Sequence, residues 1–274
     1  MREIEERAQS TLDKHTRAFY RDALRLLIEA GAPFLVGGAY AFQHYTGIER
    51  HTKDFDIFVH PRDCERILQI FANAGYQTDL TFPHWLGKVY NGDAFVDVIF
   101  SSGNGVAQVD DDWFARASEA TVFGIPVKLI PPEEMLWSKM FVMERERYDG
   151  ADVAHLIRAY GDRLDWQHLI ERFDTHWRVL FSHLVLYGFI YPAEQAQIPD
   201  RVLLHLSRRL HTELPLEVTA RAATDEKVCG GTLISREQYL HDTQKWGYED
   251  GRIAEGHMTP DQVRQWTDAI DTIP

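Results

Sequence analysis

The chain has few cysteines and no long apolar run. Its 274 residues include only two cysteines, Cys64 and Cys229, which lie far apart in the sequence. This number is too small for a disulfide framework or a cysteine-rich metal site, and it favours a reducing compartment. No apolar stretch approaches the roughly 20 residues that a membrane-spanning helix needs. The first residues are mostly charged and lack the apolar core of a secretory leader, so we expect a cytoplasmic protein.

Basic residues are also scarce. Lysine and arginine number 29 against 42 aspartates and glutamates, which gives a net charge of −13 with the histidines neutral. Proteins that bind long nucleic acids use Lys and Arg to neutralise phosphates, so this balance disfavours a large RNA partner. A local basic patch is still compatible with it. Part of the acidic excess is explained if a cluster of carboxylates is neutralised by a bound metal ion.

Hydrophobic periodicity predicts an α+β fold, in which strands and helices come first and helices alone follow. We expect helices over residues 11–30, 39–45 and 62–74, and strands over 34–36, 54–59, 76–80, 85–90 and 95–100. A further strand or hairpin is expected over 122–129. Asn91-Gly92-Asp93 predicts a hairpin turn between the last two of the five strands.

Beyond Pro131 the pattern is helical. We expect helices over residues 132–143, 149–160, 165–173, 176–187 and 200–210. This organisation predicts an α/β domain over residues 1–130, a helical domain over 131–213 and a C-terminal appendage over 214–274 whose role the sequence does not indicate. The oligomeric state is likewise left open.

Two aspartates stand two residues apart in a short apolar run, Lys53-Asp54-Phe55-Asp56-Ile57-Phe58-Val59. Strand side chains alternate between faces, so both carboxylates share one face and the apolar side chains take the other. Burying two like charges without compensation costs on the order of several kcal/mol, so we expect a cation between them. Mg²⁺ is the natural candidate for an oxygen-only site, and it points to phosphoryl or nucleotidyl transfer.

Three further features accompany the aspartate pair. Gly37-Gly38 stands between a predicted strand and a predicted helix, where the backbone can approach a ligand and the helix N-terminus favours an anion. Asp97 interrupts the apolar run Phe95-Val96-Asp97-Val98-Ile99-Phe100 and is a candidate third carboxylate. Lys139 precedes a group of charged residues that ends at Asp152, and this group could place a cation near phosphates.

Together these motifs resemble the DNA polymerase beta-like nucleotidyltransferase superfamily, over roughly residues 30 to 160. Its signature is Gly-Gly or Gly-Ser after a strand, a helix, Asp-x-Asp on the next strand and a third aspartate on a later strand. The stretch Arg50-His51-Thr52-Lys53-Asp54-Phe55-Asp56-Ile57 is similar to a segment of minimal nucleotidyltransferases and abortive-infection toxin-type enzymes. Lys139 with Arg147-Tyr148-Asp149-Gly150-Ala151-Asp152-Val153 resembles their later motif, although Tyr148 stands where a lysine is usual.

The resemblance implies a small mixed-sheet nucleotidyltransferase head with flanking helices. It implies transfer of NMP from an NTP such as ATP to an acceptor hydroxyl, with release of pyrophosphate. Two Mg²⁺ ions, or Mn²⁺ in their place, would be held by Asp54, Asp56 and Asp97, and Asp97 would also take the hydroxyl proton. Nucleotide contacts are implied for Gly37, Gly38, Thr52, Lys53, Lys139, Asp149 and Asp152. The acceptor stays open among an RNA end, a protein side chain and a small molecule, and a toxin is one version.

Simpler interpretations exist for each residue. The aspartate pair fits the solvent face of an edge strand, Lys139 fits a solvated position beside a core stripe, and Asp149 fits a helix N-cap. The 13 histidines form no His-x-x-x-His pair near the aspartates, so we expect scattered surface or structural roles.

A non-catalytic binding module on the same fold is the main alternative function. It is favoured if the three carboxylates lie more than about 8 Å apart, because they then cannot share Mg²⁺. A phosphohydrolase in which Asp54 acts as the nucleophile is the third functional hypothesis.

Overall fold

A computed structural model describes residues 12–50, 54–213 and 227–269 of the chain. The chain divides into two compact units. The first combines Met1–Met135 with Met258–Pro274, and the second is Leu136–His257. The boundary between them falls inside helix α6 (Pro132–Met140). Among the described residues, none of the helices is long and apolar enough to cross a membrane.

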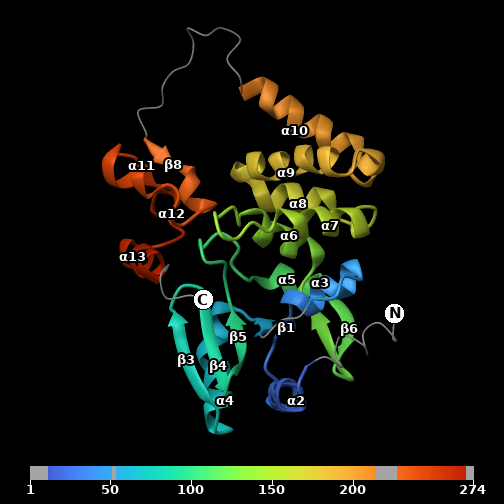
Figure 1. The fold of residues 1–274 in the computed structure, drawn as a ribbon, viewed down its shortest axis with the longest axis vertical. Coiled ribbons are helices and arrows are strands. Elements are labelled where there is room, and N and C mark those ends of the chain that lie inside the picture. Colours follow the sequence, from blue (N-terminus) through green and yellow to red (C-terminus); the bar gives the residue numbers. More distant parts are fainter. Residues whose placement is uncertain (1–11, 51–53, 214–226, 270–274) are drawn as a thin grey trace. The chain divides into compact units, whose positions relative to one another are not determined.

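The first unit is built on a seven-stranded mixed sheet (Figure 1). Its strands are β1 (Leu35–Val36), β2 (Asp54–Phe58), β3 (Gln77–Phe82), β4 (Leu86–Asn91), β5 (Ala94–Ile99), β6 (Ser118–Val122) and β7 (Ile125–Leu129). They lie in the order β3-β4-β5-β2-β1-β7-β6. The pairs β2–β5 and β1–β7 are parallel, and the other pairs are antiparallel. Strands β2 and β5 are not consecutive in the chain, so their pairing joins segments that are distant in the sequence.

Helices complete this unit. They are α2 (Lys14–Glu29), α3 (Gly38–Thr46), α4 (Cys64–Asn73, preceded by the 3-10 turn η1, Pro61–Asp63), α5 (Asp111–Ala115) and α13 (Pro260–Asp268). Helix α2 begins at the cap Asp13, whose carboxylate accepts bonds from the backbone of His15 and Thr16. Its buried face contributes Tyr20, which stacks on the buried Phe55 of β2 at 5.1 Å between ring centroids. Burial of each such large side chain stabilises the fold by about 1.5–3 kcal/mol.

The second unit is mainly helical. It contains the end of α6, then α7 (Gly150–Tyr160), α8 (Trp166–Phe173), η2 (Asp174–His176), α9 (Trp177–Ile190), η3 (Pro192–Gln197) and α10 (Asp200–Glu213). Helix α9 packs against α7, α8 and α10 (Figure 1). The remaining elements are β8 (Val228–Cys229), η5 (Gly230–Leu233), α11 (Leu240–Lys245), β9 (Glu249–Asp250) and α12 (Gly251–Ala254).

The α+β fold class predicted from the sequence is confirmed. The hairpin turn is confirmed as well, because Asn91 pairs with Ala94 and Gly92 adopts a positive φ of 62°. The segment over residues 122–129 is part of a hairpin formed by β6 and β7. The sequence analysis did not predict α5 or the short elements after residue 227, since these are only two to nine residues long and carry little periodic signal.

A buried histidine links α9 to the end of α6 within the second unit. His183 is 3% exposed, and its Nε2 lies 2.9 Å from the carbonyl oxygen of Met140. A carbonyl only accepts hydrogen bonds, so Nε2 carries the proton of the neutral ring. Burial lowers the pKa of His183 from its usual 6.5, although the bond to Met140 acts in the opposite direction.

The lowered pKa of His183 predicts acid-dependent stability. As the pH falls through about 6.5, the unfolded chain takes up a proton that the folded state resists, so the free energy of unfolding declines. His183→Gln keeps an N–H donor for Met140 but does not titrate. We expect the free energy of unfolding of the wild type to fall relative to that of His183→Gln, by at most about 1.4 kcal/mol per pH unit. Urea unfolding between about pH 8 and pH 5 measures this difference, and parallel curves for the two proteins would contradict it.

Candidate active site

Three aspartates meet on adjacent strands of the sheet. One carboxylate oxygen each from Asp54, Asp56 and Asp97 lies within 4.8 Å of the others. The parallel register of β2 and β5 produces this convergence, because it sets Asp56 directly beside Asp97. The separation is well below the roughly 8 Å at which the carboxylates could not share an ion. The wide separation that would have favoured a non-catalytic binding module is therefore not found.

Strand alternation positions these side chains. Asp54 and Asp56 are partly buried on one face of β2, whereas Phe55 and Ile57 are fully buried on the other. The donor set of the cluster is oxygen only, which suits Mg²⁺. Ligands of an octahedral Mg²⁺ at about 2.1 Å lie about 3.0 Å apart when adjacent and about 4.2 Å apart when opposite. Carboxylate oxygens that lie within 4.8 Å of one another are compatible with both spacings, so these residues fit the ion.

A lysine that the sequence analysis missed completes the cluster. Lys88 on β4 donates from Nζ to Oδ1 of Asp97 at 2.8 Å, and its ammonium lies 4.1 Å from the centroid of the Phe95 ring. The side chains of Lys88 and Asp97 are only 20% and 13% exposed. Lys88 and Asp97 are directly opposite one another in the β4–β5 hairpin. The position of the turn at Gly92 was predicted, and extending the strand pairing from this turn would have identified Lys88 as the partner of Asp97.

Burial and neighbouring charges shift the pKa values of Asp97 and Tyr20 at the cluster. Burial raises the pKa of Asp97, Lys88 counteracts this effect, and the negative charge of Asp54 adds to it. Burial, followed by the charges of the three aspartates, also raises the pKa of Tyr20, whose side chain is fully buried. Tyr20 therefore remains a protonated hydroxyl. It is a second residue that the sequence analysis did not single out.

The two predicted glycines are tied to β2. Gly37 donates from its backbone N–H to the carbonyl oxygen of Asp56 at 3.0 Å, and a Cβ at Gly37 would overlap the ring of Phe58. Gly38 is the first residue of α3 and has a φ of +52°. A Cβ at Gly38 would overlap the carboxylate of Asp56. The absence of a side chain thus lets the start of α3 touch a cluster carboxylate.

The later predicted residues form a separate cluster in the second unit. Lys139 donates from Nζ to Asp149 at 2.9 Å and to Asp152 at 2.8 Å, and Arg147 also bonds Asp149. Burial raises the pKa of Asp149, but Lys139 and Arg147 outweigh burial, so the pKa lies below its usual value. Asp149 occupies the N-cap position of α7 without a side-chain cap bond, because its carboxylate is turned to these cations. Two other predicted residues, Thr52 and Lys53, lie outside the described residues.

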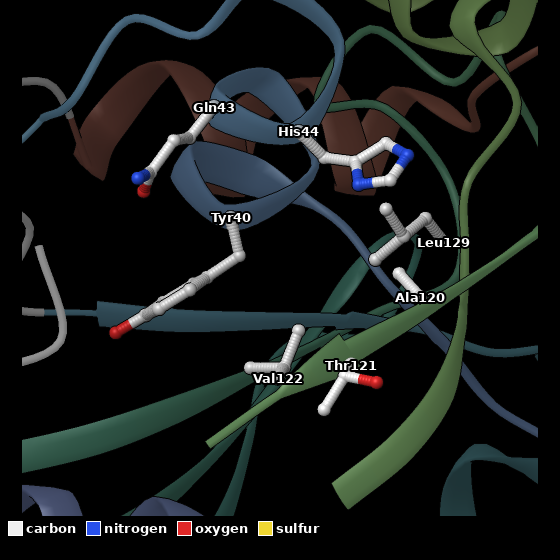
Figure 2. Close-up of a pocket in the computed structure, with 7 residues that line it drawn as sticks. All are labelled: Tyr40, Gln43, His44, Ala120, Thr121, Val122 and Leu129. Carbon is white, nitrogen blue, oxygen red and sulfur yellow. The ribbon is translucent and has the colours of Figure 1, made fainter. Parts of the chain in front are cut away.

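A small pocket lies beside α3. Figure 2 shows Tyr40, Gln43 and His44 reaching it from the helix, and it is completed by Ala120, Thr121, Val122 and Leu129. This lining contains none of the predicted site residues and no carboxylate. The carboxylate cluster is therefore the stronger candidate for chemistry.

Comparison with known proteins gives a family match for most of the chain. Residues 3–190, more than half of the chain, match the family described as uncharacterised nucleotidyltransferase. None of the curated proteins matches the chain.

Solved structures give more distant similarities. The antibiotic-resistance factor ANT(2″)-Ia is 16% identical, with a TM-score of 0.45 over 65% of this chain and 99% of that one. The lincosamide antibiotic adenylyltransferase LnuA, solved with lincomycin, is 15% identical, with a TM-score of 0.38 over 53% of this chain and 96% of that one. JHP933 from Helicobacter pylori is 13% identical, with a TM-score of 0.37 over 74% and 97% of the two chains.

The contact between Gly38 and Asp56 predicts a specific effect of Gly38→Ala. The new Cβ must displace the Asp56 carboxylate, and the positive φ adds about 1–2 kcal/mol of strain. We expect Mg²⁺ or Mn²⁺ to raise the melting temperature of the wild type, and we expect the variant to lose both stability and this metal-dependent rise. Thermal unfolding with and without the metal measures both effects.

Gly31→Ala is the matched control, because Gly31 has a φ of +57° but open space around its Cβ position. Gly31→Ala should lose only the stability that backbone strain costs, and its melting temperature should still rise when the metal is added. Identical behaviour of the two variants would refute the proposed contact.

The pairing of Lys88 with Asp97 predicts how charge is balanced when no metal is bound. In Lys88→Met the partly buried Asp97 loses its cation, so we expect the metal-free protein to lose about 1–3 kcal/mol of stability. Metal then supplies the missing positive charge, and the increase in melting temperature on adding Mg²⁺ should exceed that of the wild type. Lys128→Met is the control, since Lys128 is an exposed lysine of the same sheet. An unchanged melting temperature of Lys88→Met in EDTA would count against this account.

Proposed function

Since the chain belongs to the nucleotidyltransferase family that it matches, we propose that it transfers a nucleoside monophosphate from an NTP to an acceptor hydroxyl and releases pyrophosphate. The observation that carries the proposal is the convergence of the three carboxylates within 4.8 Å on adjacent strands, with the start of a helix against one of them. A non-catalytic binding module would not need three partly buried acids on one face of a sheet, where their mutual repulsion costs stability.

The carboxylates of Asp54, Asp56 and Asp97 would hold Mg²⁺, as two ions, with Mn²⁺ as a substitute. When bound, these ions would lower the pKa of the acceptor hydroxyl and neutralise the triphosphate and the leaving pyrophosphate. The fit rests on the oxygen-only donor set and on the spacing of the carboxylates.

Asp97 is the residue that we assign to proton transfer. In the proposed step the acceptor oxygen forms a bond to the α-phosphorus, the bond from that phosphorus to the bridging oxygen breaks, and the hydroxyl proton passes to a carboxylate oxygen of Asp97. Burial keeps the pKa of Asp97 above its usual value, which makes it a better proton acceptor than an exposed aspartate. Lys88 positions this carboxylate through its bond to Oδ1.

Gly37 and Gly38 would bring the first N–H groups of α3 close to the phosphates, where the helix N-terminus favours negative charge. The close approach that Gly38 makes to Asp56 supports this role, because a phosphate bound at the aspartate cluster would lie near the same backbone. We retain Thr52, Lys53, Lys139, Asp149 and Asp152 as proposed nucleotide contacts. The carboxylates of Asp149 and Asp152, which accept hydrogen bonds from the Lys139 ammonium, would position it to contact a phosphate.

The acceptor is proposed only as a class of hydroxyl. An RNA end, a protein side chain and a small molecule all fit the chemistry, and the net charge of −13 makes a long RNA the least favoured. If the chain acts as a toxin, Asp54→Ala should abolish growth arrest on expression.

The proposed reaction predicts the behaviour of Asp54→Asn. Incubation of the purified protein with each labelled NTP, Mg²⁺ and a cell extract should move label into an RNA, protein or small-molecule fraction. Asp54→Asn keeps the side-chain shape but removes the charge, so transfer should fall at least about 100-fold. The same loss is expected for Asp97→Asn.

Asp93→Asn is the control, because Asp93 is an exposed aspartate in the turn that precedes β5. It should retain wild-type transfer. Absence of transfer from every NTP by a folded wild-type protein would favour the binding-module alternative, and phosphate covalently trapped on Asp54 would favour a phosphohydrolase.

A further inference from the structure

A second cluster of metal-binding side chains lies in the second unit, far along the sequence from the aspartates. His176 ends the 3-10 turn η2, Glu255 follows helix α12, and His257 stands two residues later. One ligand atom from each residue lies within 4.8 Å of the others. The Nε2 atoms of His176 and His257 approach the same oxygen, Oε2 of Glu255, at 2.7 and 3.1 Å. The donor atoms of three residues thus converge on one small volume.

The chemistry of this donor set differs from that of the aspartate site. Two imidazole nitrogens and one carboxylate oxygen are typical ligands of Zn²⁺, whereas Mg²⁺ prefers oxygen alone. In a tetrahedral zinc site with bonds of about 2.0–2.1 Å, neighbouring ligand atoms lie about 3.3–3.4 Å apart. The present separations of 2.7 and 3.1 Å need to open by about 0.6–0.7 and about 0.2–0.3 Å. We propose that His176, Glu255 and His257 form a Zn²⁺ site.

The surroundings support this assignment. The ring of Phe141 meets His176 edge to face at 5.4 Å between centroids, and Phe173 stacks on Phe141, so the orientation of the imidazole is fixed by packing. Arg252 stands three residues before Glu255, but its guanidinium is engaged by Asp250 at 2.6 and 2.9 Å. The negative charge of Glu255 therefore faces the two imidazoles rather than this arginine.

Exposure indicates the kind of site. The side chains of His176, Glu255 and His257 are 15%, 35% and 25% exposed, so solvent reaches the cluster. Three protein ligands leave the fourth tetrahedral position to water. A bound Zn²⁺ would join the segment after α12 to the start of α9, across 79 residues of sequence between His176 and Glu255. Its role would be to hold these segments of the second unit together, independently of nucleotidyl transfer.

A hydrogen-bonded latch without metal is the competing explanation. In the latch both imidazoles carry a proton on Nε2 and donate it to Glu255. In the zinc site both Nε2 atoms direct a lone pair to the metal, and the remaining ring proton is on Nδ1. Only the second arrangement gives a metal-dependent signal, so metal binding separates the two.

The test uses the full chain with Asp54→Asn and Asp56→Asn, in which the aspartate site is disabled. Titration with Co²⁺, a spectroscopic substitute for Zn²⁺, should give a visible absorption typical of tetrahedral nitrogen and oxygen ligation, saturating at about one equivalent. Zn²⁺ should displace the Co²⁺ and raise the melting temperature. His176→Ala, Glu255→Ala and His257→Ala should each weaken binding at least about 100-fold.

His205→Ala is the matched control, because His205 is an exposed histidine of α10 outside the cluster. It should bind metal as the parent does. Circular dichroism verifies that each variant is folded, and His257→Gln gives a second, milder substitution if His257→Ala is not. The proposal is overturned if the folded parent binds no Co²⁺ or Zn²⁺, or if the cluster variants bind as tightly as His205→Ala.

Discussion

The parallel pairing of β2 with β5 is the constraint on which the candidate active site depends. It sets Asp56 beside Asp97 and brings Asp54 into the same group. Like charges this close repel, so the pairing carries a cost that the surrounding structure must offset. The apolar faces of the two strands supply that stabilisation, since Phe55 and other alternate residues are fully buried. The sheet therefore holds a charge cluster that it would not form for stability alone.

The aspartate cluster and the cluster around Lys139 differ in how their charges are balanced. In the aspartate cluster Lys88 bonds one carboxylate, yet burial still raises the pKa of Asp97. In the second unit Lys139 and Arg147 overcome burial, and the pKa of Asp149 is lowered. At Asp97 burial thus outweighs the single lysine, whereas at Asp149 the two cations outweigh burial. This contrast supports the proposal of a metal at the aspartates rather than at the Lys139 cluster.

Much of the fold was predictable because its signals are local. Alternation along β2, the helical periods and the turn at Gly92 are encoded within a few residues, and each matched the structure closely. Lys88 was missed although the turn implied it, since counting back from Gly92 along the hairpin sets Lys88 opposite Asp97. The His176–Glu255–His257 cluster had no such signal, because 79 positions of sequence separate His176 from Glu255.

The sequence by itself determined which side chains share a strand face and where paired glycines allow a close approach of the backbone. The period of a strand put Asp54 and Asp56 together, and Gly37-Gly38 marked a place of close backbone approach. Only the tertiary structure decided what lies next to them. Beside β1, the other neighbour of β2 is β5 rather than β3, the strand that follows β2 in the chain, and Gly38 touches the carboxylate of Asp56. These contacts depend on packing between distant segments, and no local pattern of residues specifies that packing.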